Sequence, residues 1–134
     1  MEGHPIRDRP DYRTHALPFS THGDGVPIAA VGKTWQKSCE AYSFASAIGV
    51  GPTLLMNFVI GFIFKAMAVE KTYETFMTIL VWSLYWMSLG QWPDRDWNGI
   101  VYVRGTFEYH LHHTVKWLAN KFYGILWIIR GDLE

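Results

Sequence analysis

Two long uncharged runs dominate the pattern of polar and apolar positions. The first covers residues 41–64 and the second covers residues 75–93. About 20 apolar residues in helical conformation cross the hydrocarbon core of a bilayer, so each run is long enough for a membrane span. The four charged residues between the runs lie within residues 65–74 and mark a short polar connection. The pattern therefore predicts an all-α membrane protein built on a two-span helical hairpin.

The hairpin is expected to occupy residues 33–93, with spans at about 41–69 and 74–92. Pro52 interrupts the first span, because it lacks an amide hydrogen and its ring crowds the preceding helical turn. We therefore expect one helix from about Thr34 to Val69 that is kinked or restarted at residues 51–52. Unpaired carbonyl groups are costly in lipid, so the kink indicates contact with a partner.

Small and polar residues cluster around this kink. In a helix, small side chains at spacings of four let a second helix approach closely, and an amide side chain can bond across to it. We therefore predict a helix-packing surface, which consists of Ala45, Ala47, Gly49, Gly51, Pro52 and Asn57.

The first 32 residues contain four of the six prolines, at positions 5, 10, 18 and 27. Each proline removes a backbone donor and biases the preceding residue away from helix. Residues 1–32 are therefore predicted to form an extended polar arm, which is either disordered or lies along a partner. Scattered apolar residues such as Tyr12, Leu17 and Phe19 would serve as anchors in the second case.

The C-terminal part, residues 94–134, begins with a turn-rich connection and continues with a helical repeat of apolar residues. The repeat consists of Leu111, Val115, Leu118, Phe122, Ile125 and Ile129. It predicts an amphipathic helix over residues 107–130 that lies at the membrane interface or against a partner. A third span is the alternative, and Lys116 and Lys121 argue against it.

Charge adds information on sidedness and partners. Only 18% of the 134 residues are charged, below the roughly 25% of soluble domains, and the formal net charge is zero. No basic stripe is present that would bind nucleic acid. Two spans joined by a short loop place both tails on one side of the membrane. The tails together carry ten of the twelve Lys and Arg residues, so the positive-inside rule favours the matrix, cytoplasm or stroma for them.

Candidate chemistry is sparse. His110 and His113 share a helix face and are candidate metal ligands, but Glu108 is the sole third ligand nearby and no HExxH or CxxC motif is present. We favour contact of these histidines with lipid phosphate or a neighbouring subunit. Neither predicted span contains a histidine, so we expect no haem held by this chain alone. We also expect no other cofactor and no catalytic residue, because no reactive group has a companion in the sequence. Bound lipid is compatible with the pattern. The single cysteine, Cys39, excludes an internal disulfide.

In its predicted architecture the chain resembles the supernumerary subunits of mitochondrial inner-membrane complexes, either of the respiratory chain or of ATP synthase. Residues 10–13, Pro-Asp-Tyr-Arg, are similar to a stretch near the start of one complex I accessory subunit. The resemblance implies an integral inner-membrane location and a non-catalytic accessory subunit that stabilises or helps assemble a large complex, with other membrane subunits and lipids as partners. The alternative is a redox-active membrane anchor that contributes to a quinone or haem site with a second subunit.

Overall fold

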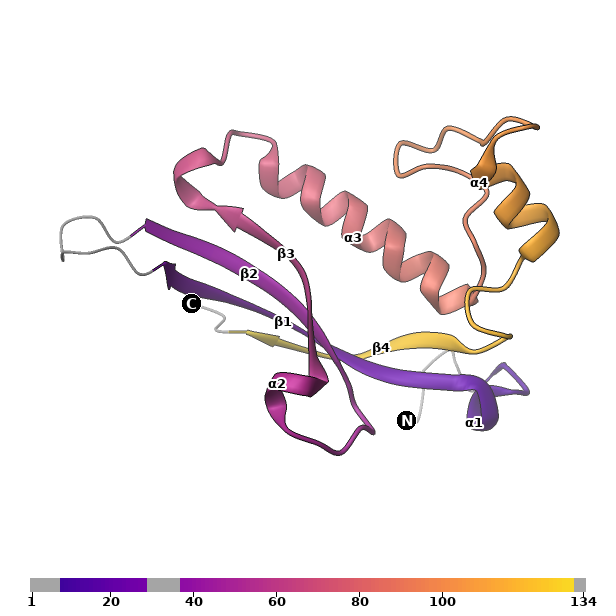
Figure 1. Cartoon of the computed structure of the whole chain (residues 1–134), viewed down its shortest axis with the longest axis horizontal. Helices are drawn as coiled ribbons and strands as arrows, with labels where there is room; N and C mark the ends of the chain where they lie inside the picture. Colours follow the sequence, from indigo (N-terminus) through magenta and orange to yellow (C-terminus); the bar gives the residue numbers. More distant parts are fainter. Residues whose placement is uncertain (1–7, 29–36, 132–134) are drawn as a thin grey trace. The chain divides into compact units, whose positions relative to one another are not determined.

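The computed structural model describes residues 8–28 and 37–131. It contains both helices and strands (Figure 1). In chain order the elements are α1 (Tyr12–His15), β1 (Ala16–Ile28), β2 (Lys37–Ser46), α2 (Thr53–Met56), β3 (Asn57–Phe64), the 3-10 turn η3 (Lys65–Met67), α3 (Thr72–Leu89), α4 (Phe107–His110), the π-helical turn η4 (Leu111–Val115) and β4 (Tyr123–Gly131).

The strands form a four-stranded sheet in the order β3-β2-β1-β4. β2 pairs antiparallel with both β1 and β3. The register between β2 and β3 shifts at Tyr42/Ser43, because Val59 lies opposite Ser43 while Gly61 lies opposite Tyr42. Ile60 is therefore an extra residue, and such a bulge changes which side chains point to each face.

The chain divides into two compact units. Unit 1 comprises residues 1–17 and 78–125, and unit 2 comprises residues 18–77 and 126–134. The core of unit 1 contains Tyr123, which is 2% exposed, and Ile125. The guanidinium group of Arg9 lies 3.5 Å from the centre of the Tyr123 ring, and the Tyr123 hydroxyl donates to Asp11 at 3.1 Å. These contacts tie the N-terminal part of unit 1 to residues far away in the sequence.

Unit 2 is organised by aromatic pairs across its strands. The ring of Phe44 contacts Phe19 edge-on at 6.4 Å and stacks on Phe58 at 5.3 Å between centroids. Tyr42, two residues along β2, contacts Phe76 at 4.5 Å. Aromatic cross-strand pairs stabilise a sheet beyond the apolar area that they bury, so the Phe44–Phe58 stack helps to set the register of β2 and β3.

The predicted all-α hairpin is wrong. The first predicted span, residues 41–69, contains the end of β2, then α2, β3 and η3. A short apolar run does not distinguish a helix from a buried strand, and NFVIGFIF in β3 consists largely of β-branched and aromatic residues that favour strands. The second predicted span, residues 74–92, corresponds largely to the helix α3.

Membrane insertion is likewise not supported. Within residues 8–28 and 37–131, no helix combines the length and the apolar character that crossing a bilayer requires. The predictions of a transmembrane hairpin and of an integral inner-membrane location are therefore wrong, and a redox-active membrane anchor loses the spans that it needs.

The predicted break at residues 51–52 has a different context from the one expected. The chain leaves β2 at Ser46, and α2 begins at Thr53 directly after Pro52. The Leu55 amide donates to the Pro52 carbonyl at 2.9 Å, as in the first turn of a helix. The segment before the break is a strand and a loop, and residues 34–36 of the predicted helix lie outside the described part of the chain.

The predicted C-terminal helix, residues 107–130, is also wrong. α4 and η4 together end at Val115, and β4 begins at Tyr123. Three residues between them, Lys116, Asn120 and Lys121, have positive φ angles of 65°, 46° and 71°. An α-helix requires negative φ at every residue, so the apolar stripe is divided between a helical segment and a strand.

The predicted N-terminal arm is only partly described. α1 forms a single turn, and β1 extends from Ala16 to Ile28 within the sheet. The strand pairs with β2 of the same chain, from Phe19 opposite Ser46 onward. Residues 1–7 and 29–32 of the predicted arm lie outside the described residues.

Candidate functional site

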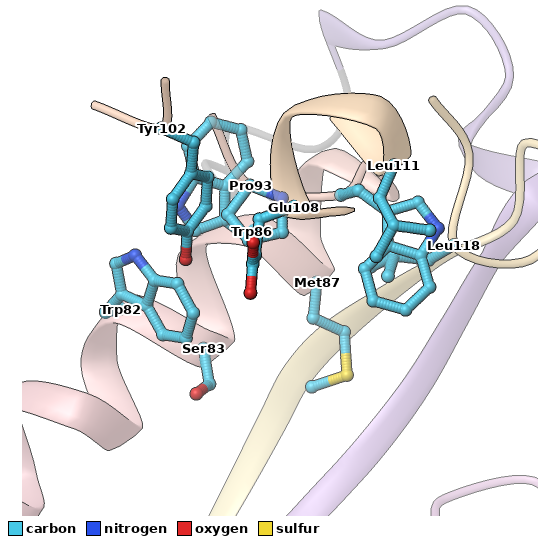
Figure 2. A pocket seen from close by; sticks show the side chains of 10 residues that line it. Trp82, Ser83, Trp86, Met87, Pro93, Tyr102, Glu108, Leu111 and Leu118 are labelled. Carbon is cyan, nitrogen blue, oxygen red and sulfur yellow. The ribbon is translucent and has the colours of Figure 1, made fainter. Parts of the chain in front are cut away.

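A cavity of about 320 Å³ opens in unit 1 beside the second half of α3 (Figure 2). Aromatic and aliphatic side chains make up most of its lining. The lining residues are Trp82, Ser83, Trp86, Met87, Trp92, Pro93, Tyr102, Glu108, Leu111 and Leu118. They come from α3, from the loop that follows it, from the segment α4–η4 and from the connection to β4.

α3 supplies two indole rings through its helical period. Trp82 and Trp86 are four residues apart and therefore lie on the same helix face. Trp86 is buried, and its ring meets the His112 imidazole edge-on at 6.1 Å. The Trp82 Nε1–H donates to the Arg95 carbonyl at 3.1 Å. Each indole is thus oriented by a contact with the chain beyond α3.

The end of α3 is closed by Gly90, whose φ of +69° suits the left-handed position after a helix. The Leu118 amide donates to the Gly90 carbonyl at 2.9 Å, and the Trp92 amide donates to the Lys116 carbonyl at 2.9 Å. These bonds hold the segment after α3 antiparallel to residues 116–118. They place Trp92 and Leu118 on the same wall of the cavity.

A tight turn positions Tyr102. The Asp96 carboxylate accepts hydrogen bonds from the amides of Asn98 and Ile100, both at 2.9 Å. This is the behaviour expected of an aspartate that stabilises a turn. The Tyr102 amide then donates to the Asp94 carbonyl at 3.0 Å, which returns the chain toward the cavity.

The cavity has an acidic character. Glu108 is the one acidic side chain among the ten lining residues, and none of them is basic. Figure 2 shows the Glu108 side chain extending from α4 into the group of lining side chains. Desolvation raises the pKa of Tyr102, and the negative charges of Asp96 and Glu108 raise it further.

Arg95, whose carbonyl accepts the Trp82 Nε1–H bond, is already paired with another carboxylate. Arg95 donates to both oxygens of Asp94, at 2.6 and 3.0 Å. This bond holds the pKa of Asp94 below its usual range and raises the pKa of Arg95. Arg95 is therefore already engaged by a neighbouring carboxylate at the rim of the site.

The lining combines aromatic and apolar groups with a few polar ones. Its one aliphatic hydroxyl, on Ser83, donates to the Ile79 carbonyl at 2.8 Å within α3. The cavity otherwise presents aromatic faces, apolar groups and one carboxylate. These are the groups that fix the orientation of a small ligand.

The predicted metal ligands do not meet a third partner. His110 ends α4, while the His113 ring stacks on Tyr109 at 3.8 Å and its Nδ1 donates to the Tyr109 carbonyl at 3.0 Å. His112 donates instead to the Trp92 carbonyl at 2.7 Å. No group of three or more His, Cys, Asp or Glu side chains suited to a metal ion occurs in the part of the chain that the structure describes.

Two of the predicted helix-packing residues lie in paired strands. Ala45 in β2 stands opposite Asn57 of β3, so both take part in the sheet. Ala47 follows β2, and its amide donates to the Pro18 carbonyl at 2.9 Å. A spacing of four residues defines one face only in a helix, so these residues do not form the predicted surface.

The other predicted helix-packing residues belong to the loop before α2. Gly49 and Gly51 face the Met56 side chain: a Cβ on Gly49 would overlap its methyl group, and one on Gly51 would lie 3.1 Å from its sulfur. Pro52 precedes the first residue of α2. Small residues here make room for Met56 rather than for a partner helix.

The cavity itself was not predicted from the sequence. The Trp82/Trp86 spacing was a usable signal, because two indoles on one helix face need a common environment. Trp92, Tyr102 and Glu108 join them only through the loop and the segment α4–η4. No protein-family model, no curated protein and no solved structure matches this chain. Function is therefore argued from the surfaces themselves.

Proposed function

We propose that this chain is a non-catalytic accessory subunit of a larger hetero-oligomeric protein assembly, which it joins through β3 in unit 2. The observation that carries the proposal is that β3 is an outer strand whose large apolar side chains are exposed. Phe58 is 54% exposed, Val59 60% and Phe62 53%.

The outer edge of β3 is available for pairing. β3 stands at the end of the strand order, and β2 is its one neighbour in the described sheet. Outer strands that remain single are usually protected by charged side chains, by proline or by a covering segment. The eight residues of β3 include no charged residue and no proline. A bulge, which also protects outer strands, is present at Ile60.

Both faces of β3 contribute apolar surface. Residues directly opposite each other in a sheet share a face, so Phe58 lies on the face of Phe44, whereas Phe62 lies on the other face with Ala41. Segments next to β3 add further exposed apolar side chains, which are Ile48, Val50, Leu55, Met67 and Val69. Exposed apolar side chains gathered along one strand and its flanking segments are typical of protein interfaces.

The surface favours a large partner over a single added layer. A flat apolar layer would cover one face of β3 and leave Phe58 or Phe62 exposed on the other. A partner that also pairs with the edge of the strand has to enclose it, as a multi-subunit assembly does. The resemblance to accessory subunits of respiratory-chain complexes and ATP synthase rested on the two-span architecture, which the structure contradicts, so the proposal names no particular complex.

The proposal is tested by native gel electrophoresis of the tagged full chain from its own cells. We expect migration in a stoichiometric complex far above the chain mass of 15.5 kDa. Phe62→Lys should remove the chain from this complex, because the ammonium group would have to be desolvated at the interface. Phe107→Lys is the matched control, since Phe107 is 70% exposed but belongs to unit 1.

Two results would overturn the proposal. One is a wild-type chain that migrates as a monomer, or as a complex containing only copies of itself. The other is a Phe62→Lys variant that stays in the complex as fully as Phe107→Lys does.

A further inference from the structure

The cavity of unit 1 combines aromatic faces with a single negative charge. Three indole rings and one phenol ring line it, from Trp82, Trp86, Trp92 and Tyr102. The carboxylate of Glu108 extends among the lining side chains (Figure 2). Because this cavity lies within unit 1, an inference from it does not depend on the interface proposed for unit 2.

The charge of the lining selects the sign of the ligand. Aromatic faces carry partial negative charge and attract cations, most strongly in the case of tryptophan. An anion would meet the Glu108 carboxylate without any basic lining residue to balance it. A neutral apolar ligand would gain neither cation–π attraction from the rings nor an ionic contact with that carboxylate. A cation satisfies both the rings and the carboxylate.

The donors and acceptors of the lining select the kind of cation. A primary ammonium group has three N–H donors that need acceptors once water is removed. The described lining offers the Glu108 carboxylate and the Tyr102 and Ser83 hydroxyls as side-chain acceptors, whereas its other seven residues present apolar groups and indole rings. Most of the surface that a cation would contact therefore suits methyl groups better than N–H groups. An ammonium nitrogen that carries methyl groups needs few or no acceptors and fills apolar space. The volume of about 320 Å³ is at the lower end of the range for small-molecule sites.

We propose that this cavity binds the alkylated ammonium group of a small organic cation. The rings of Trp82, Trp92 and Tyr102 contact the methyl groups, and the Glu108 carboxylate serves as the counter-ion. Trp86, which is buried against His112, forms the base of the site. The site binds its ligand without changing a covalent bond.

The decisive experiment compares two probes of nearly equal shape on the purified full chain. Choline carries the cationic centre, and 3,3-dimethylbutan-1-ol is its neutral carbon analogue. We expect choline to bind at least about tenfold more tightly in calorimetric titration, because only choline gains from cation–π attraction and from the carboxylate. Equal affinity for the two probes, or no detectable binding of choline, would overturn the proposal.

Variants then assign the binding to this cavity. Glu108→Gln should weaken choline binding by about three- to tenfold, because it removes the counter-ion and keeps the side-chain shape. Trp82→Leu should weaken it by about tenfold, whereas Trp82→Phe should retain most of it, because phenylalanine keeps an aromatic face. An unchanged affinity in both Glu108→Gln and Trp82→Leu would place the binding elsewhere and refute the site.

Matched controls separate local from general effects. Glu70→Gln removes a carboxylate that does not line the cavity, and Trp97→Leu removes an indole that does not line it. Both should bind choline as the wild type does. Circular dichroism of each variant verifies that it is folded, and the comparison of the two probes on wild-type protein requires no variant.

Discussion

In unit 1 three tryptophans and one tyrosine converge on a cavity, whereas in unit 2 the phenylalanines of β3 lie along an outer strand. Trp86 in unit 1 is 9% exposed, and Phe62 in unit 2 is 53% exposed. A concave aromatic surface suits a small ligand, while an open strand edge suits another protein chain. Similar residue types therefore produce two kinds of binding surface, and local backbone geometry makes the difference.

The difference arises from the period of each element. In α3 a spacing of four residues brings Trp82 and Trp86 to one face, and the loop after Gly90 closes around that face. In β3 alternate residues point to opposite faces, and the bulge at Ile60 redistributes them further. A helix followed by a tied loop encloses its aromatic side chains, while a single outer strand exposes them.

The largest expected effect tests whether Trp86, at the base of the cavity in unit 1, is packed as a core residue. Trp86→Ala should lower the free energy of unfolding by about 3–5 kcal/mol, because it removes a buried indole and leaves a cavity. Urea titration followed by tryptophan fluorescence is suited to this measurement, since Trp82, Trp86, Trp92, Trp97 and Trp117 all lie in unit 1.

Tyr85→Ala is the matched control, because Tyr85 is adjacent in sequence and 57% exposed. It should cost less than about 1.5 kcal/mol. Equal losses in Trp86→Ala and Tyr85→Ala would show that Trp86 is not packed as described.

The second effect tests the tie between α3 and the segment before β4. Gly90→Ala should destabilise unit 1 by about 2–3 kcal/mol, because φ is +69° and the new Cβ would lie 2.6 Å from the Phe122 carbonyl oxygen. Gly99→Ala should cost only about 1 kcal/mol, since φ is +84° but no atom lies within 4 Å of its Cβ. Thermal unfolding of both variants measures the difference, and equal costs would exclude the close contact at Gly90.

The third effect is the part of the pH dependence that Tyr42 of unit 2 contributes. Desolvation raises the pKa of Tyr42 from 10.0 to about 12, and its hydrogen bond to Glu40 adds to the shift. The folded state thus holds this proton more tightly than the unfolded state. The resulting stability is fully present below pH 10.0 and is lost as the pH rises from 10.0 to about 12.

Tyr42→Phe removes this titration and keeps a ring against Phe76. Urea unfolding at about pH 8 and about pH 11 should show a smaller loss of stability in the variant than in the wild type. The difference in phenolate absorbance between the wild type and Tyr42→Phe gives the pKa of Tyr42 among the seven tyrosines. Parallel losses in the two proteins would exclude a raised pKa for Tyr42.

The smallest effect on stability belongs to the exposed strand. Phe62→Lys should change the free energy of unfolding by less than about 1 kcal/mol, because Phe62 is half exposed and a lysine stem retains part of its packing. The same variant should reduce concentration-dependent association of the isolated chain, measured by light scattering. A loss above about 2 kcal/mol would mean that β3 is a core strand instead of an outer one.

The helix α3 and the break at residues 51–52 were the features most open to prediction. α3 extends from Thr72 to Leu89 and overlaps the helix predicted at 74–92, because its sequence lacks internal glycine and proline and Gly90 suits the position after its end. Pro52 interrupts the chain through its own covalent structure. Both features depend on residues close together in sequence.

The strands were less predictable because their partners are distant. The apolar run of β3 is by itself compatible with a helix. Its pairing with β2, in which Gly61 lies opposite Tyr42 and Phe58 opposite Phe44, makes it a strand. Similarly, the stripe from residue 111 to residue 129 has helical spacing, yet positive φ angles at Lys116 and Lys121 divide it. Local spacing could not exclude a strand in either segment.

By itself, the sequence determined where apolar side chains are concentrated, where Pro52 and Gly90 interrupt regular structure and that α3 is a helix. These properties follow from covalent geometry and from residues within a few positions of one another. Only the tertiary structure decided that Glu108 and Tyr102 line the same cavity as Trp82, and that β3 is an outer strand. Those arrangements require hydrogen bonds and packing between segments far apart in the chain, which local periodicity does not encode.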